Sequence, residues 1–467
     1  MSQAVVSRHG GSFRDPAGFV FLHEGRLYRQ INQAGQEDFE RFIESGLYQD
    51  LVGQKLLVPH REVKKVTGLA EDDQRYKIIE PQLVPFNSYP YEWSFSQLKD
   101  AARLTLKVQN LALARGMILK DASAYNVQFI GCRPIFIDTL SFKIYKAGDP
   151  WDGYKQFCEH FIAPLALASY SSLETLEFLR LFLDGLPLDL ATRLLPARAR
   201  WRRGLASHLF LHAVSLRRYQ SEGSKSPKTR QVSSLALQGL MASLERTIKK
   251  LPPPKAATQW SAYYENTNYS PKAFKDKQTT VAAFLDQISP RPKTVWDLGA
   301  NDGPFSRLAA EIGAYTIAFD VDAQAVEQNY LKHRKDELGE RILPLVQDLA
   351  NPSPAVGWRH AERASLLQRA PADAVLALAL IHHLAIGNNL PFDDIASFFK
   401  QLGRHLIIEF VPKEDSKVQF LLRSRNNIFT EYDQKHFETA FAKHFKRLQK
   451  RPVTDSRRVI YLYQAKV

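Results

Sequence analysis

Two features in the C-terminal part of the chain have the residue types and the spacing of a nucleotide-binding sheet. Asp297 lies in the run V-W-D-L-G-A-N-D-G, where an apolar segment leads into a turn with glycines at 299 and 303. A second apolar run, Y-T-I-A-F-D, ends at Asp320, about 20 residues further on. A glycine turn before a helix presents backbone N–H groups, and a carboxylate after the next strand can accept hydrogen bonds from ribose hydroxyls. Together they predict a site for a nucleoside-containing cofactor.

The turn also carries a resemblance to a known family. Asp297-Leu-Gly-Ala-Asn-Asp-Gly303 resembles the first motif of class I S-adenosylmethionine-dependent methyltransferases, with Asn301 in place of the middle glycine. The likeness covers residues 260–467 and implies S-adenosyl-L-methionine as the cofactor. It also implies that Asp320 holds the ribose and that Asp348 faces the adenine amino group. The motif residues implied to contact the cofactor are Asp297, Gly299, Asn301 and Gly303. A nicotinamide dinucleotide is a weaker interpretation, because acidic Asp302 would repel its pyrophosphate.

Three side chains after later apolar runs could act on a methyl acceptor. His382 and His383 follow A-V-L-A-L-A-L-I, and a neutral imidazole can serve as a base near pH 7. Glu409, in H-L-I-I-E-F, could orient a substrate. The alternatives are that one imidazole satisfies a buried backbone group while the other packs against a loop, and that Glu409 is a solvated loop acid. Carbon, oxygen and nitrogen acceptors all remain open.

A second constellation lies in the N-terminal half. Asp121 and Asn126 are five residues apart in D-A-S-A-Y-N, and Asp138 follows twelve residues later in P-I-F-I-D. This pattern resembles the catalytic centre of protein-kinase-like and aminoglycoside-phosphotransferase-like folds. The resemblance implies that Asp121 faces a hydroxyl nucleophile and that Asn126 and Asp138 are metal ligands for Mg-ATP.

The same segment departs from the kinase pattern. No glycine-rich phosphate loop is visible, and Arg29 stands where a phosphate-pairing lysine is expected, with Glu40 or Glu44 as its partner. Arginine is not equivalent to lysine at such a site. We keep open an active phosphotransferase, an ATP-regulated or substrate-binding domain, and simple turn chemistry of Asp and Asn around a hairpin.

The secondary structure predicted to position these residues differs between the N-terminal part and the C-terminal part of the chain. The N-terminal part predicts a hairpin over 18–31, a helix over 37–52, a helix over 95–115 ending at Gly116, and strands at 127–130 and 134–138. Beyond residue 255, strands and helices alternate, as in a parallel sheet with covering helices. An aromatic stretch at 260–271 could cover the cofactor or pack between domains.

We therefore expect the α/β class with two folded domains. The sequence predicts an α+β kinase-like domain over 1–190, with a β-rich lobe to about 95 and a helical lobe after it. A basic helical connector follows over 191–255, and a Rossmann-like doubly wound methyltransferase domain over 256–467. The whole layout is similar to bacterial nodulation-type methyltransferases.

The formal charge of +14 is concentrated in the connector, where residues 191–255 carry fourteen Lys and Arg against two acids. Such a segment could bind an anionic partner, RNA or an acidic surface, or could be a solvated face. Two cysteines and no CxxC pair favour a reducing compartment. The absence of a signal peptide and of any long apolar run predicts a cytoplasmic protein without a membrane span.

We expect a methyltransferase acting on an unidentified acceptor. The alternative is a kinase-like phosphotransferase or an ATP-regulated binding protein whose C-terminal part only binds a cofactor. A third possibility is a basic scaffold that has lost both chemistries. The two other functions stay open as alternatives, because fold resemblance alone does not establish chemistry.

Overall fold

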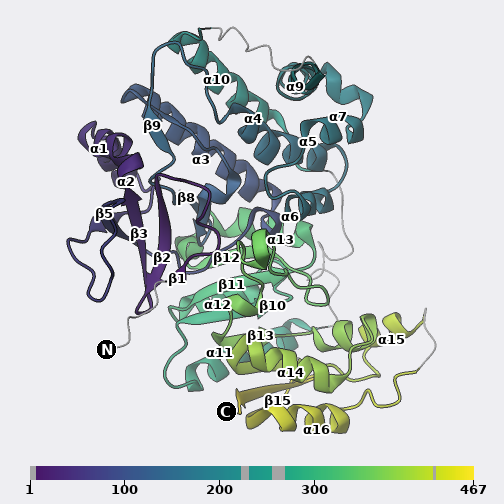
Figure 1. Cartoon of the computed structure of the whole chain (residues 1–467). Coiled ribbons are helices and arrows are strands. Elements are labelled where there is room, and N and C mark those ends of the chain that lie inside the picture. The colour runs from purple at the N-terminus through teal and green to yellow at the C-terminus, as the bar shows by residue number, and fades with distance from the viewer. Residues whose placement is uncertain (1–6, 222–230, 255–268, 424–427, 467) are drawn as a thin grey trace. The chain divides into compact units, whose positions relative to one another are not determined.

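The computed structural model describes residues 7–221, 231–254, 269–423 and 428–466. The chain forms two compact units whose boundary lies close to residue 256. Unit 1 comprises Met1–Ile130, Pro134–Ala256 and Ala355–Arg363, and unit 2 comprises Gly131–Arg133, Ala257–Pro354 and Ala364–Val467. Figure 1 labels the elements of both.

The main sheet of unit 1 is antiparallel and has the strand order β1-β2-β3-β5-β4. Its strands are β1 (Ser7–Arg8), β2 (Gly18–His23), β3 (Arg26–Asn32), β4 (His60–Glu62) and β5 (Arg75–Pro81). The predicted hairpin is confirmed: His23 pairs with Arg26, and the two turn residues, Glu24 and Gly25, have φ of 49° and 74°. A two-residue turn in which both residues have a positive φ has a backbone twist that matches the twist of the two flanking strands.

Two predicted helices of unit 1 have different outcomes. The helix over 37–52 is broken into α1 (Gln36–Glu44) and α2 (Leu47–Gly53), because Gly46 has a left-handed φ of 78°. The helix over 95–115 is confirmed as α3 (Phe95–Ala114). Ser94 caps its start by accepting from the backbone N–H of Gln97, whose side chain accepts in turn from the backbone of Ser94.

Short strands and helices complete unit 1. The strands are β6 (Met117–Leu119), β7 (Val127–Ile130), β8 (Arg133–Phe136) and β9 (Phe142–Ile144). The helices are α4 (Tyr154–Phe157), α5 (Ala163–Tyr170), α6 (Phe178–Leu181), α7 (Leu188–Leu194), α8 (Arg203–Leu205), α9 (His212–Ser221) and α10 (Ser234–Lys250). Residues 191–254, expected as a connector, therefore lie in unit 1 as far as the structure describes them, and α10 packs against α3.

Unit 2 is built on a seven-stranded sheet of order β12-β11-β10-β13-β14-β16-β15. The strands are β10 (Thr294–Leu298), β11 (Tyr315–Asp320), β12 (Ile342–Val346), β13 (Ala372–Ala377), β14 (Gly403–Phe410), β15 (Phe445–Pro452) and β16 (Val459–Ala465). The first five in this order are parallel, and β16 pairs antiparallel with β14 and β15. The chain winds outward in opposite directions from the β10 and β13 pair, and such a switch point is where open α/β sheets bind ligands.

The helices of unit 2 are α11 (Pro271–Gln287), α12 (Pro304–Glu311), α13 (Ala323–His333), α14 (Phe392–Leu402), α15 (Ser416–Leu422) and α16 (Gln434–His444). The predicted alternation from β10 to β14 is confirmed, whereas the hairpin of β15 and β16 was not predicted. After buried Phe445, every residue of β15 is exposed, so its sequence K-R-L-Q-K-R-P has no buried face to mark it as a strand. No helix in the described part of the chain is both long and apolar enough to cross a bilayer.

Candidate functional site

The loop between β10 and α12 has the backbone that a close-fitting ligand loop requires. Gly299, Asn301 and Gly303 have left-handed φ values of 74°, 51° and 84°. Asn tolerates this conformation better than other non-glycine residues, so Asn301 can replace a glycine here. A Cβ at Gly303 would lie 2.8 Å from the side-chain nitrogen of Asn329, so the position has no room for a larger residue.

Two carboxylates meet beside this loop, one from each of two paired strands. Asp297 of β10 is buried and accepts from the Ser306 hydroxyl at 2.6 Å. Asp320 ends β11 and accepts from the backbone N–H of Asn301 at 2.8 Å and of Asp322 at 2.9 Å. Burial raises the pKa of Asp297 to about 7, and the charge of Asp320 adds to that rise. Burial also raises the pKa of Asp320 to about 6.

Asp348 lies two residues beyond the end of β12, at the same carboxyl edge of the sheet. The backbone N–H of neighbouring Gln347 donates to the carbonyl of Asp320 at 2.8 Å, which ties the two strand ends together. Asp348 is half-buried, and its Oδ1 accepts from the backbone N–H of Ala350 at 2.8 Å. The parallel sheet thus brings Asp297, Asp320 and Asp348 to one edge.

The histidine pair follows β13 at that edge. His382 is fully buried, and neither of its ring nitrogens has a hydrogen-bond partner among the described residues. This finding excludes, within the described chain, the alternative that His382 satisfies a buried backbone group. A buried polar group without a partner marks a place where a ligand or water belongs.

Backbone strain and charge both surround His382. Ala379 has a left-handed φ of 54°, which is unfavourable for alanine and concentrates at functional sites. The ring centroids of His382 and His383 are 4.1 Å apart. Burial lowers the pKa of His382 well below its ordinary value and that of His383 to about 4, with nearby cations adding to both shifts. Both imidazoles are therefore neutral at pH 7.

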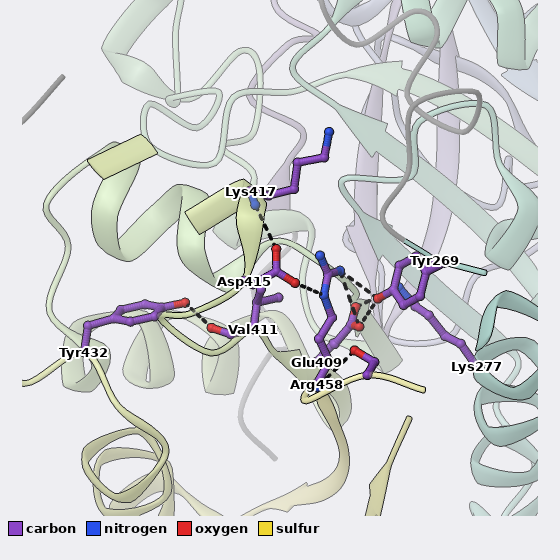
Figure 2. Close-up of polar contacts among 9 residues, drawn as sticks. Tyr269, Lys277, Glu409, Val411, Asp415, Lys417, Tyr432 and Arg458 are labelled. Carbon is purple, nitrogen blue, oxygen red and sulfur yellow. Dashed lines mark hydrogen bonds and ion pairs between the residues drawn. The ribbon is translucent and has the colours of Figure 1, made fainter. Parts of the chain in front are cut away.

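Glu409 lies inside β14 and is completely buried, so its interpretation as a solvated loop acid is wrong. Its Oε2 is 2.7 Å from Nζ of Lys277, and its Oε1 accepts from the hydroxyl of Tyr269. Arg458 Nη1 lies 3.7 Å from the same Oε1 and donates to the Tyr269 oxygen at 2.7 Å. Figure 2 shows these side chains converging from α11, β14 and the residues before β16.

The network continues through Arg458, whose Nε donates to Oδ2 of Asp415 at 2.8 Å. Positive and negative groups thus alternate through a buried region, an arrangement in which each charge needs its neighbours. Burial acts to raise the pKa of Glu409, but Lys277 and Arg458 hold it below its ordinary value. Glu409 is consequently an ionised, well-satisfied carboxylate and a poor base.

Sequence reasoning missed Lys277, Arg458 and the role of Tyr269. Residues 260–268 of the aromatic stretch lie outside the described chain, whereas Tyr269 joins the network. Lys277 had a signal, because it shares one helical face with buried Ala273 and Val281. The sequence held no such signal for Arg458, since this residue follows a polar turn and reaches Glu409 only through the pairing of β16 with β14.

The N-terminal constellation also comes together in space. The side chain of Asn126 and the charge of Asp138 both act on Asp121, whose pKa is raised mainly by burial. Asp121 also accepts from the backbone N–H of Ser123 at 2.9 Å. Arg29 forms an ion pair with Oδ1 of Asp138. The expected partnership of Arg29 with Glu40 or Glu44 is wrong, because Arg29 pairs with Asp138 and Glu40 accepts from Tyr76 and Gln36.

In this structure the two residues predicted to bind magnesium, Asn126 and Asp138, are engaged by other groups. Oδ1 of Asp138 receives the Arg29 guanidinium and the backbone N–H of Leu140, and Oδ2 accepts from the Ser141 hydroxyl at 2.7 Å. The amide nitrogen of Asn126 donates to that same hydroxyl at 3.0 Å. The metal role of Asn126 and Asp138 stays a prediction, and in this structure the Arg29 guanidinium already pairs with the carboxylate of Asp138. Three or more His, Cys, Asp or Glu side chains do not gather as a metal site anywhere in the described ranges.

Comparison with known proteins gave one strong sequence relationship. No protein-family model matches the chain. Nodulation protein NoeA of Rhizobium meliloti strain 1021 is 36% identical over 469 residues, which span 98% of this chain and 96% of that protein.

Solved structures with partial likeness include three transferases. Magnesium protoporphyrin IX methyltransferase of Synechocystis PCC 6803, with bound SAH, is 17% identical over 44% of this chain and 91% of its own, with a TM-score of 0.31. N-methyltransferase NodS of Bradyrhizobium japonicum WM9 is 10% identical over 42% of this chain and 99% of its own, with a TM-score of 0.31. The bifunctional kinase-methyltransferase WbdD is 15% identical over 41% of this chain and 39% of its own, with a TM-score of 0.29.

Proposed function

The chain belongs to the family of the nodulation protein NoeA, and we propose that it is an S-adenosylmethionine-dependent methyltransferase. The observation that carries the proposal is the pairing of the left-handed loop at Asn301 with the carboxylate of Asp320. The loop and the carboxylate lie at the switch point of a doubly wound sheet whose last strands are antiparallel. This arrangement resembles the class I methyltransferase fold. The acceptor is not identified.

The chemistry of the donor set fits this cofactor. A carboxylate has about four lone-pair sites. Asp320 uses two of its sites for backbone N–H groups, which leaves capacity for ribose hydroxyls. Asp348 is half-buried at the same edge and is suited to an adenine amino group. Acidic Asp302 favours a ligand without phosphates, whereas Asp297, with its pKa raised to about 7, carries only part of a negative charge near neutral pH.

Bound S-adenosylmethionine supplies an electrophilic methyl group, so the protein mainly has to align the acceptor and manage its proton. We propose that His382 does this. As a neutral imidazole it can accept a hydrogen bond from the acceptor with one ring nitrogen and donate one with the other. Its two partnerless nitrogens leave both functions available to a ligand. Burial also keeps bulk water from competing for them.

We assign Glu409 a positioning role in this mechanism. Its carboxylate is held ionised by Lys277 and Arg458, which keep its pKa below the ordinary value despite burial, so it is a poor base for a proton of the acceptor. The network instead joins α11, β14 and the residue before β16, as the side chains in Figure 2 show. Because Lys277 and Arg458 both lower the pKa of His382, the same network helps to keep that imidazole neutral. His383, half-buried beside it, packs against the ring.

Calorimetric titration of the full chain with S-adenosylmethionine tests the proposal. We expect saturable binding, and we expect Asp320→Asn to weaken it by about 10-fold or more because the ribose loses a charged acceptor. Asp433→Asn is the matched control, since Asp433 caps α16 at a site remote in sequence and its loss removes the same charge. Absence of binding by the unmodified chain would overturn the proposal, and equal losses in both variants would overturn the assignment of Asp320.

A further inference from the structure

One surface of unit 1 combines exposed arginines with exposed apolar side chains. Residues 190–221 contain seven arginines and no lysine, aspartate or glutamate. The exposed fractions of their large apolar side chains are 86% for Trp201, 66% for Leu211, 49% for Leu194 and 37% for Val214. We call this the Arg-Trp surface and define it by Arg193, Leu194, Arg198, Arg200, Trp201, Arg202, Arg203, Leu211, Val214, Arg217 and Arg218.

The buried residues of this segment fix which faces point outward. Ala191, Ala199, Leu205, Leu209 and Ala213 are buried. The exposed positions 207, 211, 214, 215 and 218 recur at intervals of three or four along the continuous helical run that ends with α9. This spacing places them on one outer face of the helix. The protein therefore presents apolar groups here that its own core does not use.

Contacts between the elements join these groups into one surface. The guanidinium of Arg200 lies 5.2 Å from the ring centroid of Phe210, which places neighbouring Trp201 close to the helix that carries Leu211. Asp189 on α7 forms ion pairs with Arg193 at 3.5 Å and with Arg217 on α9 at 3.2 Å. Helices α7 and α9 pack against each other (Figure 1).

Two cations of this surface, Arg202 and Arg203, stand apart from the ion pairs that Asp189 makes. Asp189 lies at its edge and serves two of the arginines. Arg202 and Arg203 are exposed and take part in none of the ion pairs found among the described residues. All seven cations are arginines, whose planar fork binds phosphate oxygens in pairs more readily than a lysine ammonium does.

We propose that the Arg-Trp surface docks on an anionic phospholipid bilayer. Indole rings favour the boundary between headgroups and acyl chains, and exposed leucines beside them can enter the apolar layer. Guanidinium groups at the same level bind lipid phosphates, whose charge complements that of the surface. Exposed apolar side chains beside exposed arginines thus match the two layers of a lipid surface.

RNA fits this surface less well. Single-stranded nucleic acids are bound by aromatic side chains on which successive bases stack. Trp201 is the exposed aromatic residue among the described side chains of residues 190–218, and Leu194, Leu211 and Val214 cannot replace stacking partners. Apolar groups would be left facing phosphates and water in an RNA complex.

The test is flotation of the purified full chain with vesicles of phosphatidylcholine alone or mixed with phosphatidylglycerol. We expect the chain to float with the anionic vesicles only, and binding to fall as salt rises. Arg202→Glu with Arg203→Glu should weaken binding by about 10-fold or more. Trp201→Ala should weaken it by roughly 5-fold while leaving the salt dependence unchanged.

Lys64→Glu with Lys65→Glu is the matched control, since this adjacent exposed pair undergoes the same charge change outside the Arg-Trp surface. Thermal unfolding of each variant checks that the fold is retained. Equal binding by the unmodified chain and both surface variants would overturn the proposal, as would failure to bind anionic vesicles. Binding of an RNA oligonucleotide in place of vesicles, abolished by the same substitutions, would assign the surface to the other partner.

Discussion

The backbone N–H of Asn301, in the loop after β10, donates to Oδ2 of Asp320, the last residue of β11, at 2.8 Å. Asn301 has a left-handed φ of 51° in the turn that makes this hydrogen bond. The side-chain oxygen of Asn301 accepts from the backbone N–H of Asp302 at 2.9 Å. A short polar side chain thus stabilises the left-handed turn that the family motif builds with glycine.

The effect of a substitution at Asn301 on stability and cofactor affinity should depend on how easily the new residue adopts a positive φ, rather than on the polarity of its side chain. Asn301→Gly should leave S-adenosylmethionine affinity within about 3-fold, because glycine adopts a positive φ without strain. Asn301→Val should lower the free energy of unfolding by about 1–2 kcal/mol and weaken cofactor binding, because a β-branched residue is strained there. Urea unfolding and calorimetry measure both quantities. A valine variant as stable as the glycine variant would contradict this account of the loop.

The buried acid Asp297 should make ligand-free stability depend on pH. Its folded pKa is raised from 3.8 to about 7, so the neutral form contributes stability below the unfolded value that is lost as pH rises through about 7. Asp297→Asn removes that titration while keeping the shape. We therefore expect the variant to gain stability relative to the unmodified chain between about pH 5 and pH 8. Urea unfolding at both ends measures the gain, and a constant difference would contradict the raised pKa.

His382 should stay neutral through the physiological range. Burial, together with the charges of His383 and Arg458, lowers its pKa well below the ordinary value. Nitrogen-15 spectra of the imidazoles should therefore show no titration of His382 between about pH 5 and pH 8. The signals that are missing from the spectrum of His382→Asn identify the residue, and His405→Asn is the control for a histidine near the start of β14. Titration near the ordinary value would show that the ring is not sequestered.

Removing one cation of the buried network should destabilise unit 2. Lys277→Met leaves Glu409 buried with Arg458 and Tyr269 but without its nearest charge, at 2.7 Å. We expect a loss of about 3 kcal/mol in the free energy of unfolding, because a buried charge loses its partner. Lys275→Met, on the exposed face of the same helix, should change stability by less than about 0.5 kcal/mol. If chemical denaturation showed the same loss in the free energy of unfolding for both variants, the buried network would not have the structural role proposed for it.

Arg29 should act as a fixed counter-ion of Asp138. Arg29→Met should destabilise the chain by about 3 kcal/mol, since it leaves a largely buried carboxylate unpaired. Arg26→Met, at an exposed position of the same hairpin, is the control. Mg-ATP should not raise the melting temperature of the unmodified chain, because the carboxylate is already occupied. Saturable stabilisation by Mg-ATP would restore the magnesium interpretation.

The local pattern of the sequence was sufficient for much of unit 2. Apolar runs followed by Gly or Asp predicted β10 and β11, and the parallel geometry that follows from alternation placed their ends together. The positions of Asp297, Asp320 and Asp348 relative to the strands could be predicted for this reason. The sequence also predicted that Asp121, Asn126 and Asp138 belong together, because their spacing resembles a known arrangement.

Only the tertiary structure decided the environment of each charge. Whether Glu409 is solvated or buried depends on β16, whose hairpin partner β15 has no apolar periodicity, and on Lys277 and Arg458 approaching from elements far away in sequence. The same holds for Arg29, which pairs with Asp138 rather than with the helix that follows it. Sequence spacing records which residues share an element, whereas ionisation and hydrogen bonding depend on what three-dimensional packing places beside them.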